Sequence, residues 1–209
     1  METFEQFVRG QLPSPPARLL EVGSGQGELT TALAIAGYDI VGIDPMAPHG
    51  ELFRRLTLDD LDETERYDAV VAARSLHHIR DLDAALEKIA TLLEHDGLLV
   101  VDEFAWDLLD ESTLDWLWGQ RRALAAAGGQ PAPESREDLR AEWEADHLGL
   151  HGYDALRRAL DGRFREEVFV RTPHLYRLLG GASSEVLEQA LVDADGIGAL
   201  GFRYAGKPR

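Results

Sequence analysis

The sequence contains no cysteine, which excludes disulfide bonds and thiolate chemistry and favours a cytoplasmic protein. Lysine is almost as scarce, because Lys88 and Lys207 are the only lysines and the other basic residues are arginines. This preference for arginine is typical of bacterial proteins from GC-rich genomes. No run of residues approaches the ~20 apolar residues that cross a bilayer, so no membrane partner is predicted.

Positive charge of any kind is in short supply. The chain carries 38 acidic and 21 basic residues, which gives a formal net charge of −17. Proteins that bind nucleic acids need basic surfaces against the phosphate backbone, so we expect no nucleic-acid partner. A small neutral or cationic partner is compatible with this charge. A chain of 209 residues is most economically a single domain, and we expect it to be a monomer or a homodimer.

Short apolar runs alternate with helical patterns along most of the chain. This alternation predicts an α/β fold with a mostly parallel sheet. The expected strands cover residues 18–22, 38–43, 52–58, 67–72, 98–101, 166–170 and 200–205. The expected helices cover residues 27–36, 81–95, 153–160 and 184–192, and no full helix is expected between the second and third strands.

Residues 105–150 have a different character, with no predicted strand and all four tryptophans of the chain. A glycine- and proline-rich break at 128–133 divides this segment into two predicted helices. The second helix begins at a capping signal formed by Ser135 and Asp138. We therefore predict a helical insertion within the single domain, after the fifth strand.

The most informative segment runs from Leu19 to Thr30, where a buried strand leads through a Gly-x-Gly-x-Gly turn into a helix. Such a turn lets the backbone approach a ligand closely, and the free N–H groups of the helix N-terminus suit an anionic group. The dinucleotide-binding fingerprint would need glycine at position 28, where Glu28 stands. Asp44 ends the second strand, where a carboxylate can accept both hydroxyl protons of a ribose. Asp44 also precedes Pro45, so a simple turn-starting role is the alternative.

This turn, with the acidic Glu21 in the preceding strand, resembles motif I of the class I S-adenosylmethionine-dependent methyltransferases. The chain also resembles that family at Asp44, at the segment Thr57 to Leu61, and at the fourth strand with its following Ser-Leu-His-His-Ile. The approach to the fifth strand is similar too, although His-Asp-Gly stands where Pro-Gly-Gly is usual. The resemblance covers residues 18–104 and extends beyond them only by length and element order.

The resemblance implies a Rossmann-like, doubly wound sheet of seven strands and methyl transfer from S-adenosylmethionine by direct displacement. In this reading the turn lies under the methionine moiety, Glu21 orients the turn or binds the ammonium group through water, and Asp44 holds the ribose. Met46 and the segment at Thr57 would border the adenine. The implied cofactor-binding residues are Glu21, Gly23, Ser24, Gly25, Gln26, Gly27, Asp44, Pro45, Met46, Thr57, Leu58, Ala73 and Arg74.

The acceptor side is predicted from position and chemistry. Ligands of open α/β sheets bind beyond the carboxyl ends of the strands, so residues 105–150 are expected to form a lid over an aromatic-lined pocket for a small-molecule acceptor. The alternative is that the tryptophans only pack the insertion onto the sheet. The methyl group is expected to go to an O, N or C atom of the acceptor, and a base is needed only where the acceptor must lose a proton, as a phenol or an alcohol does. The candidate bases are His78, His147 and His151, and the candidate acceptor-binding residues are Phe104, Trp106, Trp116, His147 and His151.

Two other functions stay open at this point, and a metal site is not predicted. His147 and His151 are four residues apart, but the nearby glycines make a continuous helix doubtful and no third ligand is evident, so no metal is predicted. The chain could bind S-adenosylmethionine or S-adenosylhomocysteine without catalysis. A nicotinamide-dependent oxidoreductase is the second possibility, and Glu28 argues against it.

Overall fold

The computed structural model describes residues 3–62 and 64–209, which form two compact units. Unit 1 comprises the described residues of Met1–Glu103, Asp154–Val170 and Arg203–Arg209. Unit 2 comprises Phe104–Tyr153 and Arg171–Phe202. Unit 2 therefore takes in the predicted insertion and a second stretch of chain before the last strand. No helix within the described residues is both long and apolar enough to cross a membrane.

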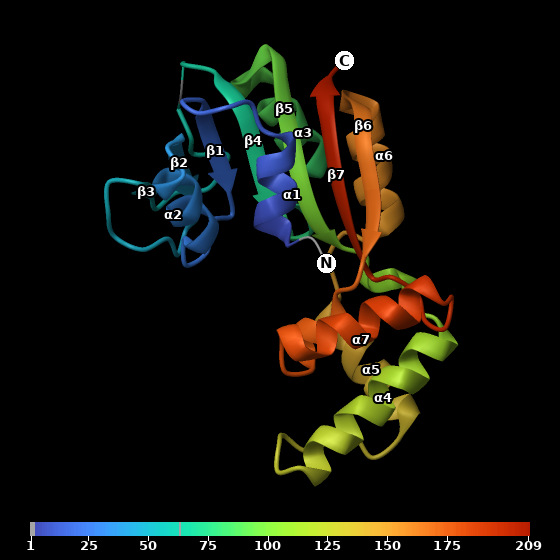
Figure 1. The fold of residues 1–209 in the computed structure, drawn as a ribbon. Helices are drawn as coiled ribbons and strands as arrows, with labels where there is room; N and C mark the ends of the chain where they lie inside the picture. The colour runs from blue at the N-terminus through green and yellow to red at the C-terminus, as the bar shows by residue number, and fades with distance from the viewer. Residues whose placement is uncertain (1–2, 63) are drawn as a thin grey trace. The chain divides into compact units, whose positions relative to one another are not determined.

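The strands form one seven-stranded sheet in the order β3-β2-β1-β4-β5-β7-β6. The pairs β1–β2, β1–β4, β2–β3 and β4–β5 are parallel, and β7 runs opposite to its neighbours in Figure 1. The mostly parallel α/β sheet predicted from the alternating pattern is therefore confirmed. The strands are β1 (Arg18–Val22), β2 (Asp39–Ile43), β3 (Phe53–Arg54), β4 (Tyr67–Ala73), β5 (Leu93–Phe104), β6 (Phe164–Thr172) and β7 (Gly201–Pro208).

The helices of unit 1 follow from apolar stripes and capping residues. Phe7 and Val8 of α1 and Leu33 of α2 belong to one core cluster with sheet residues such as Leu19 and Val71. Asp81 caps α3 by accepting the N–H of Ala84. In Figure 1, α1 lies in front of the sheet and α3 and α6 lie behind it. These helices are α1 (Phe4–Gln11), α2 (Glu28–Ile35), α3 (Leu82–Leu92) and α6 (Tyr153–Arg163), with the short 3-10 helix η1 (Leu76–His78) after β4.

Two expected elements were placed wrongly. The third strand is only Phe53–Arg54, because Thr57 to Leu61 turns back on itself through the hydrogen bond from Leu61 N to Leu58 O. The helix expected up to residue 95 ends at Leu92. Leu93 already pairs with Tyr67, after which the register shifts before Ala69 pairs with Leu98. Gly97 thus lies at an irregularity within β5.

Unit 2 is built from helices around a core of its own. Its buried cluster includes Phe104, Leu114, Leu139, Trp143 and Leu175. Ser135 and Asp138 form the predicted capping box at the start of α5. The elements of unit 2 are η2 (Trp106–Leu108), α4 (Glu111–Ala126), α5 (Arg136–Asp146), η3 (Leu175–Leu178) and α7 (Ala182–Asp193). The prediction that residues 105–150 contain two helices and no strand is confirmed.

Candidate functional site

The glycine turn lies at the carboxyl ends of β1 and β2. The N–H groups of Gly23 and Ser24 both donate to the carbonyl of Ile43, at 2.9 and 3.1 Å. Gly23, Gly25 and Gly27 have φ angles of +78°, +53° and +83°. A Cβ on Gly23 would meet Ser75, and one on Gly27 would meet the ring of Phe53, whereas nothing lies within 4 Å of the corresponding position on Gly25. Gly25 is therefore the point where a ligand can approach the backbone of the turn.

Helix α2 begins directly after this turn without a side-chain cap. Its N-cap residue is Gly27, whose lack of a side chain leaves the first-turn N–H groups without a capping oxygen. Such groups, together with the helix dipole, favour a carboxylate or phosphate. The exposed Gln26 lies beside Gly27, and the buried Ser24 has a hydroxyl with no hydrogen-bond partner in the described part of the chain. The turn therefore fits the carboxylate end of an amino-acid moiety.

Asp44 lies half-buried at the end of β2, next to the turn. Its Oδ2 accepts the N–H of Gly25 at 3.1 Å, and its Oδ1 accepts the N–H of Met46 at 2.7 Å. A carboxylate has about four lone-pair positions, so each oxygen can still accept a ribose hydroxyl. Pro45 and Met46 follow in the exposed connection, and the Met46 side chain is 75% exposed.

Glu21 is buried beneath the turn and faces α2. Its carboxyl group accepts hydrogen bonds from the hydroxyl and the backbone N–H of Thr30. Burial, with a smaller contribution from the nearby carboxylates of Glu28 and Asp44, raises the pKa of Glu21 to about 7 although the hydrogen bonds from Thr30 lower it. Glu21 thus links β1 to the first turn of α2.

The remaining residues that the resemblance predicts for cofactor binding lie at two further places in unit 1. The exposed Thr57 donates its hydroxyl hydrogen bond to Asp60, and Leu58 is buried. Ala73 ends β4. Arg74 follows it with φ +53°, a backbone conformation that non-glycine residues rarely adopt, and donates its N–H to the carbonyl of Asp102 at 2.7 Å.

A buried histidine–carboxylate pair joins the ends of β4 and β5. His77 Nδ1 lies 2.5 Å from Glu103 Oε2, and Glu103 Oε1 accepts the N–H groups of Ser75 and Leu76 at 3.0 and 2.7 Å. Ser75 in turn donates its hydroxyl to the carbonyl of Val22, at the start of the glycine turn. Because a carboxylate next to Nδ1 favours the Nδ1–H tautomer, the basic nitrogen of His77 is Nε2.

The predicted base His78 is exposed, and its ring lies 4.1 Å from that of the buried His77. Sequence reasoning did not predict Glu103, and it ranked His77 no higher than His78. The one signal in the sequence that could have pointed to Glu103 is its place beside Asp102 near the end of β5.

Unit 2 brings together most of the residues predicted to bind the acceptor. The His147 ring stacks on that of Trp106, with ring centres 5.5 Å apart and planes at 10°, and it also contacts Phe104 and Trp143. His174, which was not among the predicted residues, stacks on Phe104 at 4.0 Å. Its backbone N–H donates to the buried Glu188, whose pKa is raised by burial.

Two predicted residues are outside this aromatic group. Trp116 belongs to α4 and packs against the core of unit 2. His151 is half-buried and follows the end of α5, so His147 and His151 are not neighbours on one helix face. Within the described residues, no group of three or more His, Asp or Glu side chains is arranged to hold a metal ion.

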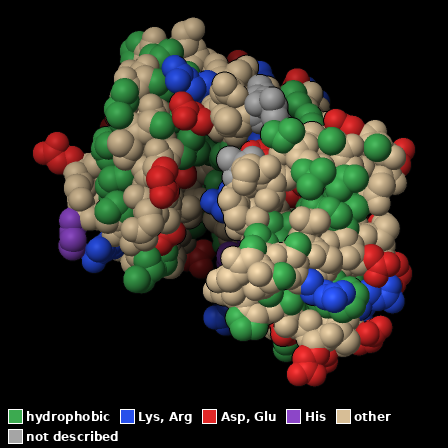
Figure 2. All heavy atoms as spheres, turned by 60° about the horizontal axis from the view of Figure 1, so that its bottom comes forward, with side chains coloured by type: hydrophobic (Ala, Val, Ile, Leu, Met, Phe, Trp, Pro, Cys, Tyr) green, Lys and Arg blue, Asp and Glu red, His purple; other side chains and the backbone are tan. Residues whose placement is uncertain are grey.

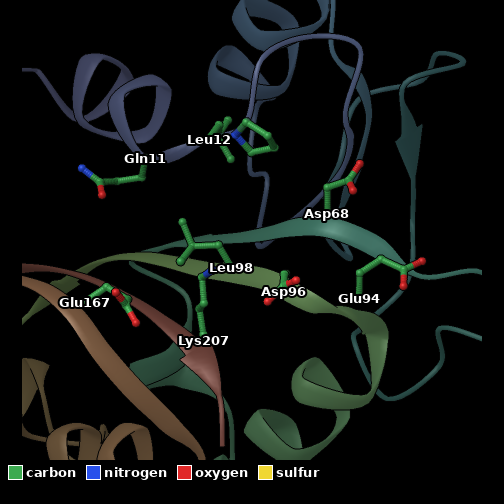
Figure 3. Close-up of a pocket in the computed structure, with 10 residues that line it drawn as sticks. Gln11, Leu12, Asp68, Glu94, Asp96, Leu98, Glu167 and Lys207 are labelled. Carbon is green, nitrogen blue, oxygen red and sulfur yellow. The ribbon is translucent and has the colours of Figure 1, made fainter.

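A cavity of about 500 Å³ lies at the amino ends of β4 and β5, away from the glycine turn (Figure 3). Asp68, Glu94, Asp96 and Lys207 line it together with apolar residues such as Leu98. It contains none of the predicted cofactor-binding residues. On the face drawn in Figure 2, Lys and Arg side chains lie apart from one another and form no continuous basic patch.

Comparison with known proteins places this geometry in context. Residues 4–150 match a family described as a methyltransferase domain. A ubiquinone biosynthesis O-methyltransferase of Bradyrhizobium sp. (strain ORS 278) is 32% identical over 126 residues, which cover 54% of this chain and 46% of that protein. The chain spans about half the length of the curated relatives it matches.

Solved structures share the fold at low sequence identity. An S-adenosylmethionine-dependent methyltransferase from Mesorhizobium loti has a TM-score of 0.61 and 16% identity, covering 99% of this chain and 98% of that one. The 1,6-didemethyltoxoflavin-N1-methyltransferase of Burkholderia thailandensis, solved with 1,6-didemethyltoxoflavin and S-adenosylhomocysteine, has a TM-score of 0.58 and 17% identity. The structural match covers 99% of this chain and 79% of the Burkholderia thailandensis chain.

The raised pKa of Glu21 predicts a pH-dependent contribution to stability. Between pH 4.5 and about 7 the folded state keeps a proton on Glu21 that the unfolded state releases, so stability falls as pH rises through this window. Between these two pH values, the free energy of unfolding of the wild type should fall by about 3 kcal/mol relative to that of Glu21→Gln. Urea unfolding at several pH values measures this, with the exposed Glu51→Gln as control. A pH-independent difference between wild type and Glu21→Gln would contradict the assignment.

Proposed function

Because this chain belongs to the methyltransferase domain family, among the class I S-adenosylmethionine-dependent methyltransferases, we propose that it methylates a hydroxyl oxygen of a small molecule. The buried His77–Glu103 pair carries this proposal. A hydroxyl acceptor must lose its proton as the new bond to carbon forms, and an imidazole oriented by a carboxylate is suited to take it. The names of the curated relatives, which are O-methyltransferases, support the same choice of atom.

The residues at the glycine turn would hold the cofactor. The first-turn N–H groups of α2 and the backbone at Gly25 would receive the methionine end, and Asp44 would accept the ribose hydroxyls. Ser24 and Gln26 complete the turn, and Pro45, Met46, Thr57 and Leu58 would border the adenine. Ala73 and Arg74 would lie near the methionine end. When bound, S-adenosylmethionine supplies a methyl group made electrophilic by the sulfonium, which leaves as a neutral thioether.

His77 and Glu103 would do the proton chemistry on the acceptor. Glu103 Oε2 holds the Nδ1–H of His77, so Nε2 is the nitrogen that would take the hydroxyl proton. The carboxylate then stabilises the imidazolium, as in other histidine–carboxylate pairs. The proposal thus assigns the base role to His77, while His78, His147 and His151 are the other candidates. An amine acceptor would need no such base.

The ribose assignment is tested by Asp44→Ala. Loss of hydrogen bonds to a charged group should weaken S-adenosylmethionine binding by about 1–3 kcal/mol, measured by calorimetric titration. Asp44→Asn is the matched variant, because it keeps one acceptor oxygen while it removes the charge. Unchanged affinity in a folded Asp44→Ala protein would mean that the ribose is bound elsewhere.

The base assignment is tested with a panel of phenols, alcohols and amines and methyl-labelled S-adenosylmethionine. For a hydroxyl acceptor, His77→Gln should lower kcat by about 10²–10⁴-fold, without a change in the dissociation constant of S-adenosylmethionine. His77→Gly should regain part of the rate when imidazole is added. The exposed His95→Gln serves as control. A His77→Gln enzyme with the wild-type rate would refute the base role, and turnover of amines alone would refute the choice of oxygen.

A further inference from the structure

The indole N–H of Trp106 is the starting observation. Trp106 lies in η2 of unit 2, and its Nε1 is buried with no hydrogen-bond partner in the described part of the chain. A buried tryptophan N–H usually finds an acceptor, because leaving it unpaired costs about 1–3 kcal/mol. The Trp106 N–H is therefore a donor for which the described residues offer no acceptor.

His147 presents the complementary group. Its Nδ1 lies 2.6 Å from the carbonyl oxygen of Trp143. A carbonyl oxygen only accepts, so Nδ1 carries the hydrogen and Nε2 of the neutral imidazole is an acceptor. Trp143 is itself held in place, because its Nε1 donates to the carbonyl of Trp106 at 3.0 Å. Two hydrogen bonds thus fix the His147 ring and its tautomer relative to Trp106.

The rings of Trp106 and His147 stack on one another. Their planes are 10° from parallel, with centres 5.5 Å apart, and both side chains are half-buried. Phe104 contacts the His147 ring edge-on, and Trp143 contacts it at a tilt. The surroundings of the His147 ring are therefore aromatic. A hydroxyl group can accept from an N–H and donate to an imidazole nitrogen. A planar ring adds stacking area against these side chains.

We infer that Trp106 and His147 form a binding site in unit 2 for a planar ring that carries a hydroxyl group. The hydroxyl oxygen accepts the N–H of Trp106, and its hydrogen is donated to His147 Nε2. The inference rests on the proposed function in one respect, since such a ligand would be the acceptor class of the O-methylation. His147 acts here in binding and specificity, and the proton transfer is assigned to His77.

Phenol, anisole and toluene are the probes, since phenol donates and accepts, anisole only accepts and toluene does neither. Full-length protein labelled with ¹⁵N-histidine is titrated with each probe, and the ring signals of His147 are identified by their loss in His147→Asn. Phenol should shift the Nε2 signal of His147, and anisole and toluene should leave it in place. Phenol should also bind at least tenfold more tightly than anisole.

Variants separate this site from the cofactor site. Trp106→Phe should weaken phenol binding about tenfold, and so should His147→Asn, whose amide N–H can still reach the Trp143 carbonyl. Trp118→Phe is the control, because its indole donates to the carbonyl of Pro133 outside the aromatic group. All three should bind S-adenosylmethionine like the wild type if the proposed function holds.

Equal binding of phenol and anisole, or wild-type phenol affinity in both site variants, would overturn the inference and leave the proposed function standing. The same holds if phenol fails to bind at millimolar concentration. Loss of S-adenosylmethionine binding by the wild type would instead refute the proposed function, whatever phenol does.

Discussion

The buried carboxylate of Glu103 connects the parts of unit 1 on which the proposed chemistry depends. One oxygen accepts the N–H groups that begin η1, and the other holds the His77 ring. Through Ser75, the same segment is hydrogen-bonded to Val22 and packed against Gly23 in the glycine turn. A buried carboxylate is tolerated only when its oxygens are satisfied, and here the partners that satisfy it belong to the candidate site.

This arrangement explains why the neighbouring residues His77 and His78 differ so much in burial. η1 turns His77 inward, where Glu103 receives its Nδ1, and leaves His78 exposed. Glu103 is 26 residues from His77 in the sequence and meets it only because β4 and β5 are parallel neighbours. No local pattern encodes such a contact, which is why sequence reasoning predicted the histidine segment but not the pair.

The fold was predictable where local signals agree with tertiary packing. β1 has the predicted bounds, and Ser135 caps the helix that it was expected to cap. The errors fall where pairing overrides local propensity. Phe53–Arg54 is the only part of the third apolar run that pairs with β2, and β5 begins at Leu93 because Tyr67 pairs with it. In unit 2 the grouping of Trp106 with His147 was predicted, whereas the His147 tautomer depends on a carbonyl that only the structure reveals.

Calorimetric titration with S-adenosylmethionine, S-adenosylhomocysteine and NAD in parallel tests the central claim most directly. The glycine turn, the uncapped start of α2 and Asp44 predict micromolar binding of the first two. Glu28, in place of the third glycine of the dinucleotide-binding fingerprint, predicts no binding of NAD. Binding of NAD alone would contradict the account and assign the turn to a dinucleotide. Binding of none of the three would reduce the turn to a structural feature of the fold.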